Sequence, residues 1–582
     1  MFDGINFRNI TEGFTFVKIY LVMLEKFLKK TSFSSMEDFR NNLELQVPEH
    51  FNFAYDVMDA WAETDPDKTA MIWVNDKGEE RRLTFMDFKT ESDKVAGYLS
   101  SIGIGKGDMV MMILKRRLEF WTVMLALHKI GAIAIPATFL LTEKDVEYRC
   151  KSAEIKAIIC CGEEKILANV AAAEPRCPFL EKMISIGPLV PEGWEDFHAG
   201  VAAAEPWKRG DFINESTDPF MLYFTSGTSD EPKMVLHNHT YGLGHIVTAS
   251  FWHKLTPDSV HLTYSDSGWG KAVWGKFYGQ WIAGACIFVY DHDKFVPSDL
   301  LELIEKYHIT SFCAPPTIYR FLIREDFSKY DLSSLKWCTT AGEALNPTVF
   351  EIFHEKTGIW IYEAFGQTET TLILGTFQWM TPRPGSMGVP NPAYDIDIIT
   401  PEGKSAKVGE EGVIAIHTDK KVPCGLFMNY YRNPKLTRKA WHDGIYYTGD
   451  VAYKDEDGYY WFLGRNDDII KTSGYRVSPF EVESAVMTHP SVVECAVTGV
   501  PDPEGLRGVV IKATIVIANE FRERIATAES TKQLVKDIQN HVKKITAPYK
   551  YPRVIEFVDT MPKTISGKIR HVEIRERDAN KD

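Results

Sequence analysis

The chain has 582 residues, of which 45% are hydrophobic and 25% are charged. This length exceeds what one compact core accommodates, so we expect at least two domains of ordinary globular composition. Acidic residues outnumber Lys and Arg by 80 to 66, and such a negative net charge disfavours nucleic acid and anionic membranes as main partners, while anionic small ligands need only a local basic pocket.

Nine cysteines without a C-x-x-C pair favour a reduced, cytoplasmic protein. Residues 1–48 are predicted as a helical extension that ends near Pro48. Within it, residues 14–27 are apolar at helical spacing but contain Lys18 and Glu25. We expect neither a signal peptide nor a transmembrane segment. A helix packed on the domain surface is favoured over a helix on a membrane surface.

Short apolar runs alternate with helical patterns between Phe53 and Tyr290, which predicts βαβ units and parallel sheets. Residues 396–416 are β-rich with glycine turns and predict a β-subdomain. The strands are expected at 109–114, 157–161, 284–290 and 310–314, and the helices at 118–129 and 301–306.

After Gly464 the pattern predicts a small α+β unit of ordinary domain size. We therefore expect an α/β fold with a large N-terminal domain over residues 1–465, a hinge near 466–468, and a mobile C-terminal domain over 468–582. In the last domain, helices are expected at 479–487 and 531–544, and strands at 492–500, 509–517 and 554–558.

Residues 223–233 read YFTSGTSDEPK, in which an apolar run leads into a loop rich in hydroxyl side chains. Such a loop can hold an anion, because backbone N–H groups, hydroxyls and a lysine all bind phosphate oxygens. It is neither a Walker loop nor a dinucleotide motif, and a plain polar surface loop is the competing interpretation. The candidate phosphate contacts are Thr225, Ser226, Gly227, Thr228, Ser229 and Lys233.

This loop resembles the signature T-[S/T]-G-[S/T]-T-G-x-P-K of the adenylate-forming superfamily, which includes acyl-CoA synthetases, luciferases and peptide-synthetase adenylation domains. Ser229 stands at a threonine position and keeps the hydroxyl. Asp230 stands at a glycine position, and aspartate tolerates left-handed backbone better than most residues. The departure therefore bears on loop mobility more than on nucleotide binding.

Further stretches match the superfamily in the same order: AGEA at 341–344, YEAFGQTET at 362–370, YTGD at 447–450, LGRNDDIIK at 463–471, KTSGYR at 471–476 and PKTISGKIR at 562–570. The resemblance implies that Thr368 bonds the α-phosphate or acyl carbonyl and that Glu369 holds Mg²⁺. Taken singly, Glu369 could be a solvated acid. Further ATP contacts implied by the resemblance are Gly342, Glu343, Glu363, Ala364, Phe365, Gly366 and Gln367.

The resemblance also assigns roles near the C-terminus. Asp450 accepts both ribose hydroxyls, Arg465 also bonds the ribose, and Asp467 is the hinge residue. Lys568 reaches the carboxylate and the α-phosphate during adenylation. Alone, Asp450 would be a turn residue and Lys568 a surface lysine.

Contacts to coenzyme A are implied by the same resemblance. Gly474 would let the pantetheine arm pass close to the backbone, and Arg476 is a catalytic candidate that contacts an anion. The basic tail at 541–553 could bind the coenzyme's phosphates, or it could be a solvated helix end. The coenzyme A contacts are Ser473, Gly474, Tyr475, Arg507, Tyr549, Lys550 and Tyr551.

The resemblance covers Val47 to Glu573 and is closest to medium-chain acyl-CoA synthetases. Acetate-specific members carry a Trp where this chain has Gly366, which favours longer acids here. Large indoles nearby limit the length, although plain core packing would also explain them. The segment bordering the acyl pocket contains Trp252, Trp269, Lys271 and Trp274, and Lys271 is expected to pair with an acid or lie near the substrate carboxylate.

The implied function is ATP-dependent conversion of a short or medium-chain acid, branched and aromatic acids included, to its CoA thioester. The reaction passes through an acyl-adenylate and releases AMP and pyrophosphate, with ATP, Mg²⁺ and coenzyme A as cofactors in a cytoplasmic enzyme of fatty acid metabolism. A homodimer is one option for the assembly. Alternatives are a ligase that loads a carrier-protein thiol, a nucleotide-binding regulator without turnover, and a luciferase-type oxygenase.

Overall fold

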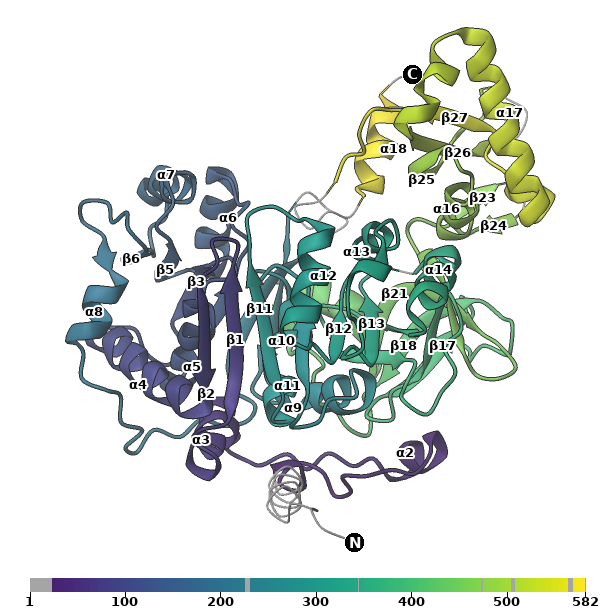
Figure 1. The fold of residues 1–582 in the computed structure, drawn as a ribbon. Coiled ribbons are helices and arrows are strands. Elements are labelled where there is room, and N and C mark those ends of the chain that lie inside the picture. Colours follow the sequence, from purple (N-terminus) through teal and green to yellow (C-terminus); the bar gives the residue numbers. More distant parts are fainter. Residues whose placement is uncertain are drawn as a thin grey trace, which may run out of the picture. The chain divides into compact units, whose positions relative to one another are not determined.

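A computed structural model describes residues 23–225, 231–343, 345–472, 475–503, 508–563 and 569–580. By its internal contacts the chain divides into two compact units. The first unit comprises residues 1–345, 349–395 and 418–439, and the second comprises 346–348, 396–417 and 440–582. Figure 1 shows that both combine helices with sheets, as the predicted α/β class requires.

One sheet of the first unit is parallel at its centre and antiparallel toward its ends. Helix α12 (Pro297–Lys306) buries Leu300, Leu301 and Ile304 in the core of this sheet, together with Phe288. The strand order is β16 (Ser386–Pro390), β15 (Leu372–Gly375), β14 (Ile361–Gly366), β13 (Trp337–Ala341), β12 (Ser311–Cys313), β10 (Val260–Thr263), β11 (Cys286–Asp291), β1 (Thr69–Asn75) and β2 (Glu80–Thr84).

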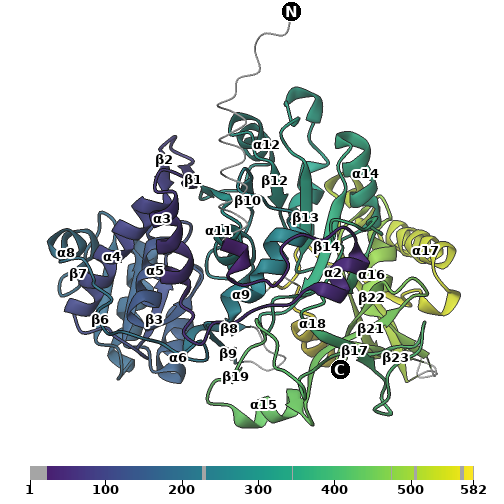
Figure 2. The same cartoon turned by 90° about the horizontal axis from the view of Figure 1, so that it is seen from below.

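The other sheet of the first unit carries helices α4 (Phe85–Ser101) and α5 (Glu119–Ile130), which lie beside β3 in Figure 2. Its central strands are buried along their whole length, which explains their continuous apolar runs. The strand order is β19 (Asn429–Tyr430), β9 (Lys233–Asn238), β8 (Pro219–Thr225), β4 (Ile133–Pro136), β3 (Met109–Ile113), β5 (Ala157–Cys161), β6 (Lys182–Ile186) and β7 (Glu195–Asp196).

The described part of the N-terminal extension is mostly extended chain with the short helix α2 (Met36–Asn42). Phe39 of α2 is fully buried, with its ring centroid 4.8 Å from that of Phe251 and 5.3 Å from that of Phe377. The insertion of the Phe39 side chain thus holds this segment on the first unit. The described part of the extension does not form the continuous helix that the sequence predicted. The predicted helix at 14–27 lies largely outside the described residues.

The second unit begins with the predicted β-subdomain, an antiparallel sheet in the order β17 (Asp395–Ile399), β18 (Gly412–His417), β21 (Ile445–Lys454) and β22 (Tyr460–Arg465). Its remainder is the predicted α+β part. The elements there are β23 (Ile470–Thr472), β24 (Tyr475–Val477), α16 (Pro479–Met487), β25 (Val492–Pro501), β26 (Val509–Ile517), α17 (Ala528–Ile545), β27 (Val554–Phe557) and α18 (His571–Ala579).

Helix α16 and strand β26 have the predicted bounds, and the other predicted elements of the α+β part differ by a few residues at their ends. Helix α17 buries Leu534, Ile538 and Val542 at helical spacing against the β25–β26 pair. Among the described residues no helix is long and apolar enough to cross a membrane.

Candidate active site

The turns after β13 and β14 lie side by side, because these strands pair in parallel with Ala341 opposite Ala364. The stretch beginning AGEA and the YEAFGQTET motif therefore meet at the carboxyl ends of neighbouring strands, where open α/β sheets bind ligands. Gly342 has φ +102°, a backbone conformation that side chains rarely adopt.

The turn that carries Thr368 is held by hydrogen bonds from both sides. The N–H of Gln367 donates to Thr370 Oγ1 over 3.0 Å, and His237 Nε2 donates to the Thr368 carbonyl over 2.8 Å. Burial lowers the pKa of His237 to about 3, so its ring is neutral and carries its proton on Nε2. His237 is thus part of the support for this turn, a role that its sequence context did not indicate.

Glu369 is bound at both its backbone and its carboxylate by one segment of chain. The N–H of Phe427 donates to the Glu369 carbonyl over 2.8 Å, and the Tyr430 hydroxyl donates to Glu369 Oε1 over 2.7 Å. Glu369 is 9% exposed and Tyr430 is 4% exposed. The ammonium of Lys233, at the start of β9, lies 5.5 Å from the centre of the Tyr430 ring.

This donor set fits the Mg²⁺ that ATP-dependent adenylation uses. A buried carboxylate oriented by a hydrogen bond is the kind of oxygen ligand that Mg²⁺ takes together with phosphate oxygens. Tyr430 is a functional candidate that sequence reasoning missed. Its short strand pairs with β9 only in the folded chain, so no local pattern identifies it.

Glu363 was predicted to contact ATP, but its side chain is bound by the backbone of the protein itself. Its carboxylate accepts the N–H of Leu345 over 3.2 Å and is also bound by the backbone of Gly385. Burial raises its pKa to about 8. The side chain therefore ties together the loops around Leu345 and Gly385, so a nucleotide contact would have to come from its backbone.

In the second unit, Asp450 and Arg465 face each other across the β21–β22 pair. Arg465 Nη1 lies 3.2 Å from each carboxylate oxygen of Asp450, and Asp450 is 5% exposed. A Cβ on Gly449 would stand 3.0 Å from Arg465 Nη2. The two predicted ribose contacts are thus brought together by antiparallel pairing.

The predicted acyl-pocket residues lie around β14. Trp252 Nε1 donates to the Tyr362 carbonyl over 3.2 Å, and Lys271 Nζ donates to the Ala341 carbonyl over 2.6 Å. The half-buried Trp269 directly precedes α10 (Gly270–Lys276). A Cβ on Gly366 would stand 2.4 Å from Trp274 Cη2, so the indole occupies the space beside this glycine.

Among the predicted coenzyme A contacts, the rings of Tyr475 and Tyr549 are stacked with centroids 4.2 Å apart. They are 51% and 41% exposed, so part of each ring is accessible to a ligand. Lys550 is paired with Glu481 at 2.5 Å, which reduces its value as a phosphate contact. Lys543 lies over the ring of Tyr551 at 4.0 Å.

Several predicted site residues are not placed by the structure. For Arg476 only the backbone, in β24, is described. The others, which lie outside the described residues, are Ser226, Gly227, Thr228, Ser229, Ser473, Gly474, Arg507 and Lys568.

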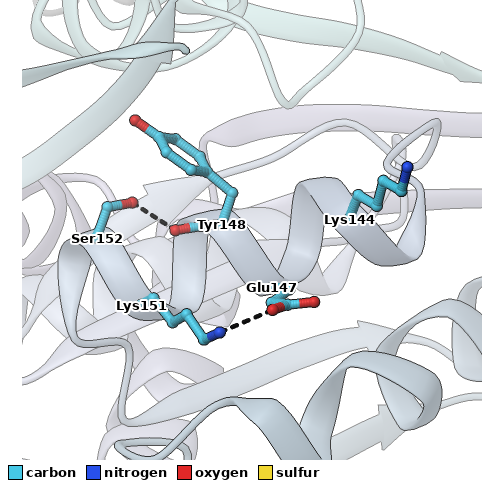
Figure 3. Close-up of a pocket in the computed structure, with 5 residues that line it drawn as sticks. All are labelled: Lys144, Glu147, Tyr148, Lys151 and Ser152. Atoms are coloured by element: carbon cyan, nitrogen blue, oxygen red, sulfur yellow. Dashed lines mark hydrogen bonds and ion pairs between the residues drawn. The ribbon is translucent and has the colours of Figure 1, made fainter.

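Helix α6 (Glu143–Ala153) contacts the chain near both ends of the candidate phosphate-binding stretch at 225–233. Tyr148 donates its hydroxyl to the Pro232 carbonyl over 3.1 Å, and Arg149 lies 5.0 Å from the centre of the Phe224 ring. Figure 3 shows Tyr148 on the opposite side of α6 from the Lys151–Glu147 ion pair. The helix borders an open surface depression of about 470 Å³.

The family model described as "AMP-binding enzyme" matches residues 58–431, and that of the "AMP-binding enzyme C-terminal domain" matches residues 481–568. The chain belongs to the AMP-binding enzyme family. Acyl-coenzyme A synthetase ACSM3, mitochondrial, from Homo sapiens is 41% identical over 554 residues, covering 94% of this chain and 93% of that protein. Acyl-coenzyme A synthetase ACSM5, mitochondrial, from Homo sapiens is 39% identical over 542 residues, with 92% of each chain covered.

Solved structures of AMP-binding enzymes share the fold. The anthranilate CoA ligase AuaEII in complex with anthranoyl-AMP matches with a TM-score of 0.82 and 28% identity, covering 92% of this chain and 98% of that chain. A benzoate CoA ligase from Burkholderia xenovorans LB400 matches with a TM-score of 0.77 and 25% identity, covering 90% and 100%. These similarities confirm the predicted family, fold class and enzyme class, an AMP-forming acyl-CoA synthetase that uses ATP, Mg²⁺ and coenzyme A.

Proposed function

We propose that this AMP-binding enzyme activates a short or medium-length carboxylic acid, branched and aromatic acids included, and transfers it to coenzyme A. A carboxylate oxygen of the acid attacks the α-phosphorus of ATP, the bond to pyrophosphate breaks, and an acyl-adenylate forms. The thiol of coenzyme A then attacks the acyl carbon, the bond to AMP breaks, and the thiol proton is released. The observation that carries the proposal is that Lys233 and Glu369 both contact Tyr430, while Glu369 directly follows Thr368 in the turn after β14.

Each group has a defined part in this reaction. Glu369 would hold Mg²⁺, which neutralises charge on the phosphates when bound. Thr368, presented by the turn that His237 supports, would donate to the α-phosphate or the acyl carbonyl. Lys233 and Lys568 would stabilise the negative charge that develops on the phosphorus centre. Asp450 would accept the ribose hydroxyls, oriented by Arg465.

The position of the Trp274 indole supports a preference for compact acids. Because its indole fills the space beside Gly366, the glycine does not by itself provide an open cavity, and the pocket should favour compact acyl groups. Anthranilate and benzoate, named for two of the solved relatives, belong in the test panel for this reason.

The test is a panel of acids scored for pyrophosphate release with ATP and Mg²⁺, with and without coenzyme A. The panel should run from acetate to octanoate, with 2-methylbutyrate, benzoate and anthranilate as compact branched or aromatic members. Acid-dependent pyrophosphate release and a CoA thioester are expected with the compact acids. Glu369→Gln serves as the inactive control, and Glu351→Gln, at an exposed position of helix α14 (Pro347–Thr357), serves as the matched control.

Coenzyme A is favoured over a carrier-protein thiol by the exposed Tyr475–Tyr549 stack next to basic residues. Aromatic faces bind the adenine base, and a carrier protein does not require them. Acyl transfer to free coenzyme A, compared with transfer to a phosphopantetheinylated carrier protein, distinguishes the two acceptors.

Compartment and assembly are also proposals. Nine buried free thiols are compatible with the reducing cytoplasm that we propose, whereas the ACSM relatives are named mitochondrial. Fractionation of cells that express the full chain decides between these locations. Light scattering of the purified protein tests the proposed homodimer.

A further inference from the structure

The hydroxyl of Tyr430 makes a buried hydrogen bond to the carboxylate of Glu369 at 2.7 Å. Both residues belong to the first unit, and their side chains are almost completely removed from water. In such surroundings a hydrogen bond to a charged acceptor is stronger than in water, and its loss leaves the acceptor incompletely satisfied. The phenol therefore restricts the rotation of the carboxylate.

The position of Tyr430 is itself well determined. Its N–H donates to Thr437 Oγ1 over 3.1 Å, its ring packs 4.9 Å from that of Phe427, and it pairs with Val235 of β9. Phe427 in turn binds the backbone carbonyl of Glu369. The segment from Phe427 to Tyr430 thus holds Glu369 at two points.

The ring of Tyr430 also faces Lys233, whose ammonium lies 5.5 Å from the ring centre. Lys233 is the last residue of the stretch with the phosphate-binding signature and the first residue of β9. One aromatic side chain therefore contacts the cation expected at the phosphates and the carboxylate expected at the metal. A cation over an aromatic face is attracted to it, so Tyr430 constrains both groups.

We propose that Tyr430 is a positioning residue that orients Glu369 for Mg²⁺ and fixes its distance from Lys233. The inference rests on the proposed role of Glu369 as the metal ligand. Mutation of a residue that hydrogen-bonds a metal ligand, without itself binding the metal, typically lowers the metal affinity by about 10- to 100-fold. Tyr430 would act through Glu369 and would not itself touch the metal.

The test is binding of Mn²⁺, as a substitute for Mg²⁺, to the full chain saturated with α,β-methylene-ATP. Free Mn²⁺ is measured by electron paramagnetic resonance, so no turnover is needed. Tyr430→Phe keeps the ring and removes only the hydroxyl, and the dissociation constant of Mn²⁺ should rise about 10-fold. Activity of this variant should recover at high Mg²⁺, with kcat less affected than the Mg²⁺ concentration that gives half-maximal rate.

Tyr431→Phe is the matched control, because Tyr431 directly follows β19, is less buried than Tyr430, and its hydroxyl is not the one that donates to Glu369. It should leave Mn²⁺ binding unchanged. Melting temperatures of both variants within a few degrees of the parent would show that folding is intact. Unchanged Mn²⁺ affinity in Tyr430→Phe would overturn the inference.

Glu369→Gln separates this inference from the proposed function. If Glu369→Gln weakens Mn²⁺ binding and adding Tyr430→Phe weakens it no further, Tyr430 acts through Glu369. If Tyr430→Phe weakens Mn²⁺ binding as much in the Glu369→Gln background as in the parent, Tyr430 acts independently of Glu369 and the positioning role is wrong. If Glu369→Gln leaves binding unchanged, Glu369 is not the ligand, and both the proposed metal role and the inference fail.

Discussion

Trp274 stands where a side chain on Gly366 would have to go, with its Cη2 atom 2.4 Å from the position of a Cβ at that glycine. Gly366, at the end of strand β14, takes the place of an indole in the motif and is thus covered by an indole from helix α10. The volume of the acyl pocket that we propose would therefore depend on two segments about ninety residues apart in the sequence.

Replacing Trp274 by Ala should extend the range of acids toward longer chains. The vacated volume would admit additional methylenes, each worth about 1–3 kcal/mol in a hydrophobic pocket. We expect the ratio of kcat/KM for octanoate to that for butyrate to rise at least about 10-fold. Trp73→Phe, on a distant strand, should leave the ratio unchanged, and an unchanged ratio in Trp274→Ala would remove Trp274 from the pocket.

Lys568→Ala should separate the two half-reactions. Loss of a cation at the reacting phosphorus should lower acid-dependent exchange of pyrophosphate into ATP by about 10²–10³-fold, while thioester formation from supplied acyl-AMP continues. Lys563→Ala is the control, because Lys563 lies five residues earlier and is paired with Glu494 at 2.5 Å. An equal fall in both half-reactions would contradict the role given to Lys568.

Asp467→Pro should impair thioester formation and spare adenylation. The turn that contains Asp467 is tight, since the Arg465 carbonyl accepts N–H bonds from Asp468 and Ile469, and Arg575 of α18 binds the Asp468 carboxylate. Fixing the backbone φ of Asp467 would restrict the rotation expected of a hinge. Pyrophosphate exchange and CoA-dependent turnover are measured in parallel, with Asp467→Ala as the control. An unaffected overall rate would rule out a hinge at this residue.

Asp450→Asn should weaken ATP binding. The carboxylate is buried beside Arg465, and a hydrogen bond to a charged group contributes about 1.5–3 kcal/mol, so KM for ATP should rise about 10- to 100-fold. Asp457→Asn, at an exposed position in the β21–β22 connection, should have no effect. The KM for the acid, measured at saturating ATP, should change much less than the KM for ATP.

Glu363 should make stability depend on pH. Burial raises its pKa from the ordinary glutamate value of 4.5 to about 8, so the folded state binds a proton more tightly than the unfolded state. This stabilisation is fully present below pH 4.5 and is lost as pH rises through about 8. The free energy of unfolding of Glu363→Gln, from urea titrations at several pH values, should fall less than that of the parent between pH 6 and 9. Parallel curves would show that Glu363 does not titrate in this range.

Local patterns predicted much of the fold. The runs at 157–161 and 509–517 and the helix at 479–487 coincide with β5, β26 and α16, because continuous burial or helical spacing is visible in the sequence itself. The N-terminal extension was less predictable. Phe39 is buried by aromatic residues more than two hundred positions away, and no local pattern records such partners.

By itself the sequence determined the family and the class of reaction: motifs in a fixed order contain the residues that we propose for phosphate, ribose and magnesium, since each motif is a short stretch whose residue types suit its ligand. Only the tertiary structure decided which of these groups lie together. Strand pairing sets Asp450 opposite Arg465, and β19 brings Tyr430 between Lys233 and Glu369. Packing places Trp274 against Gly366. These relationships depend on contacts between distant segments, which form only when the sheets and helices bury their apolar faces together.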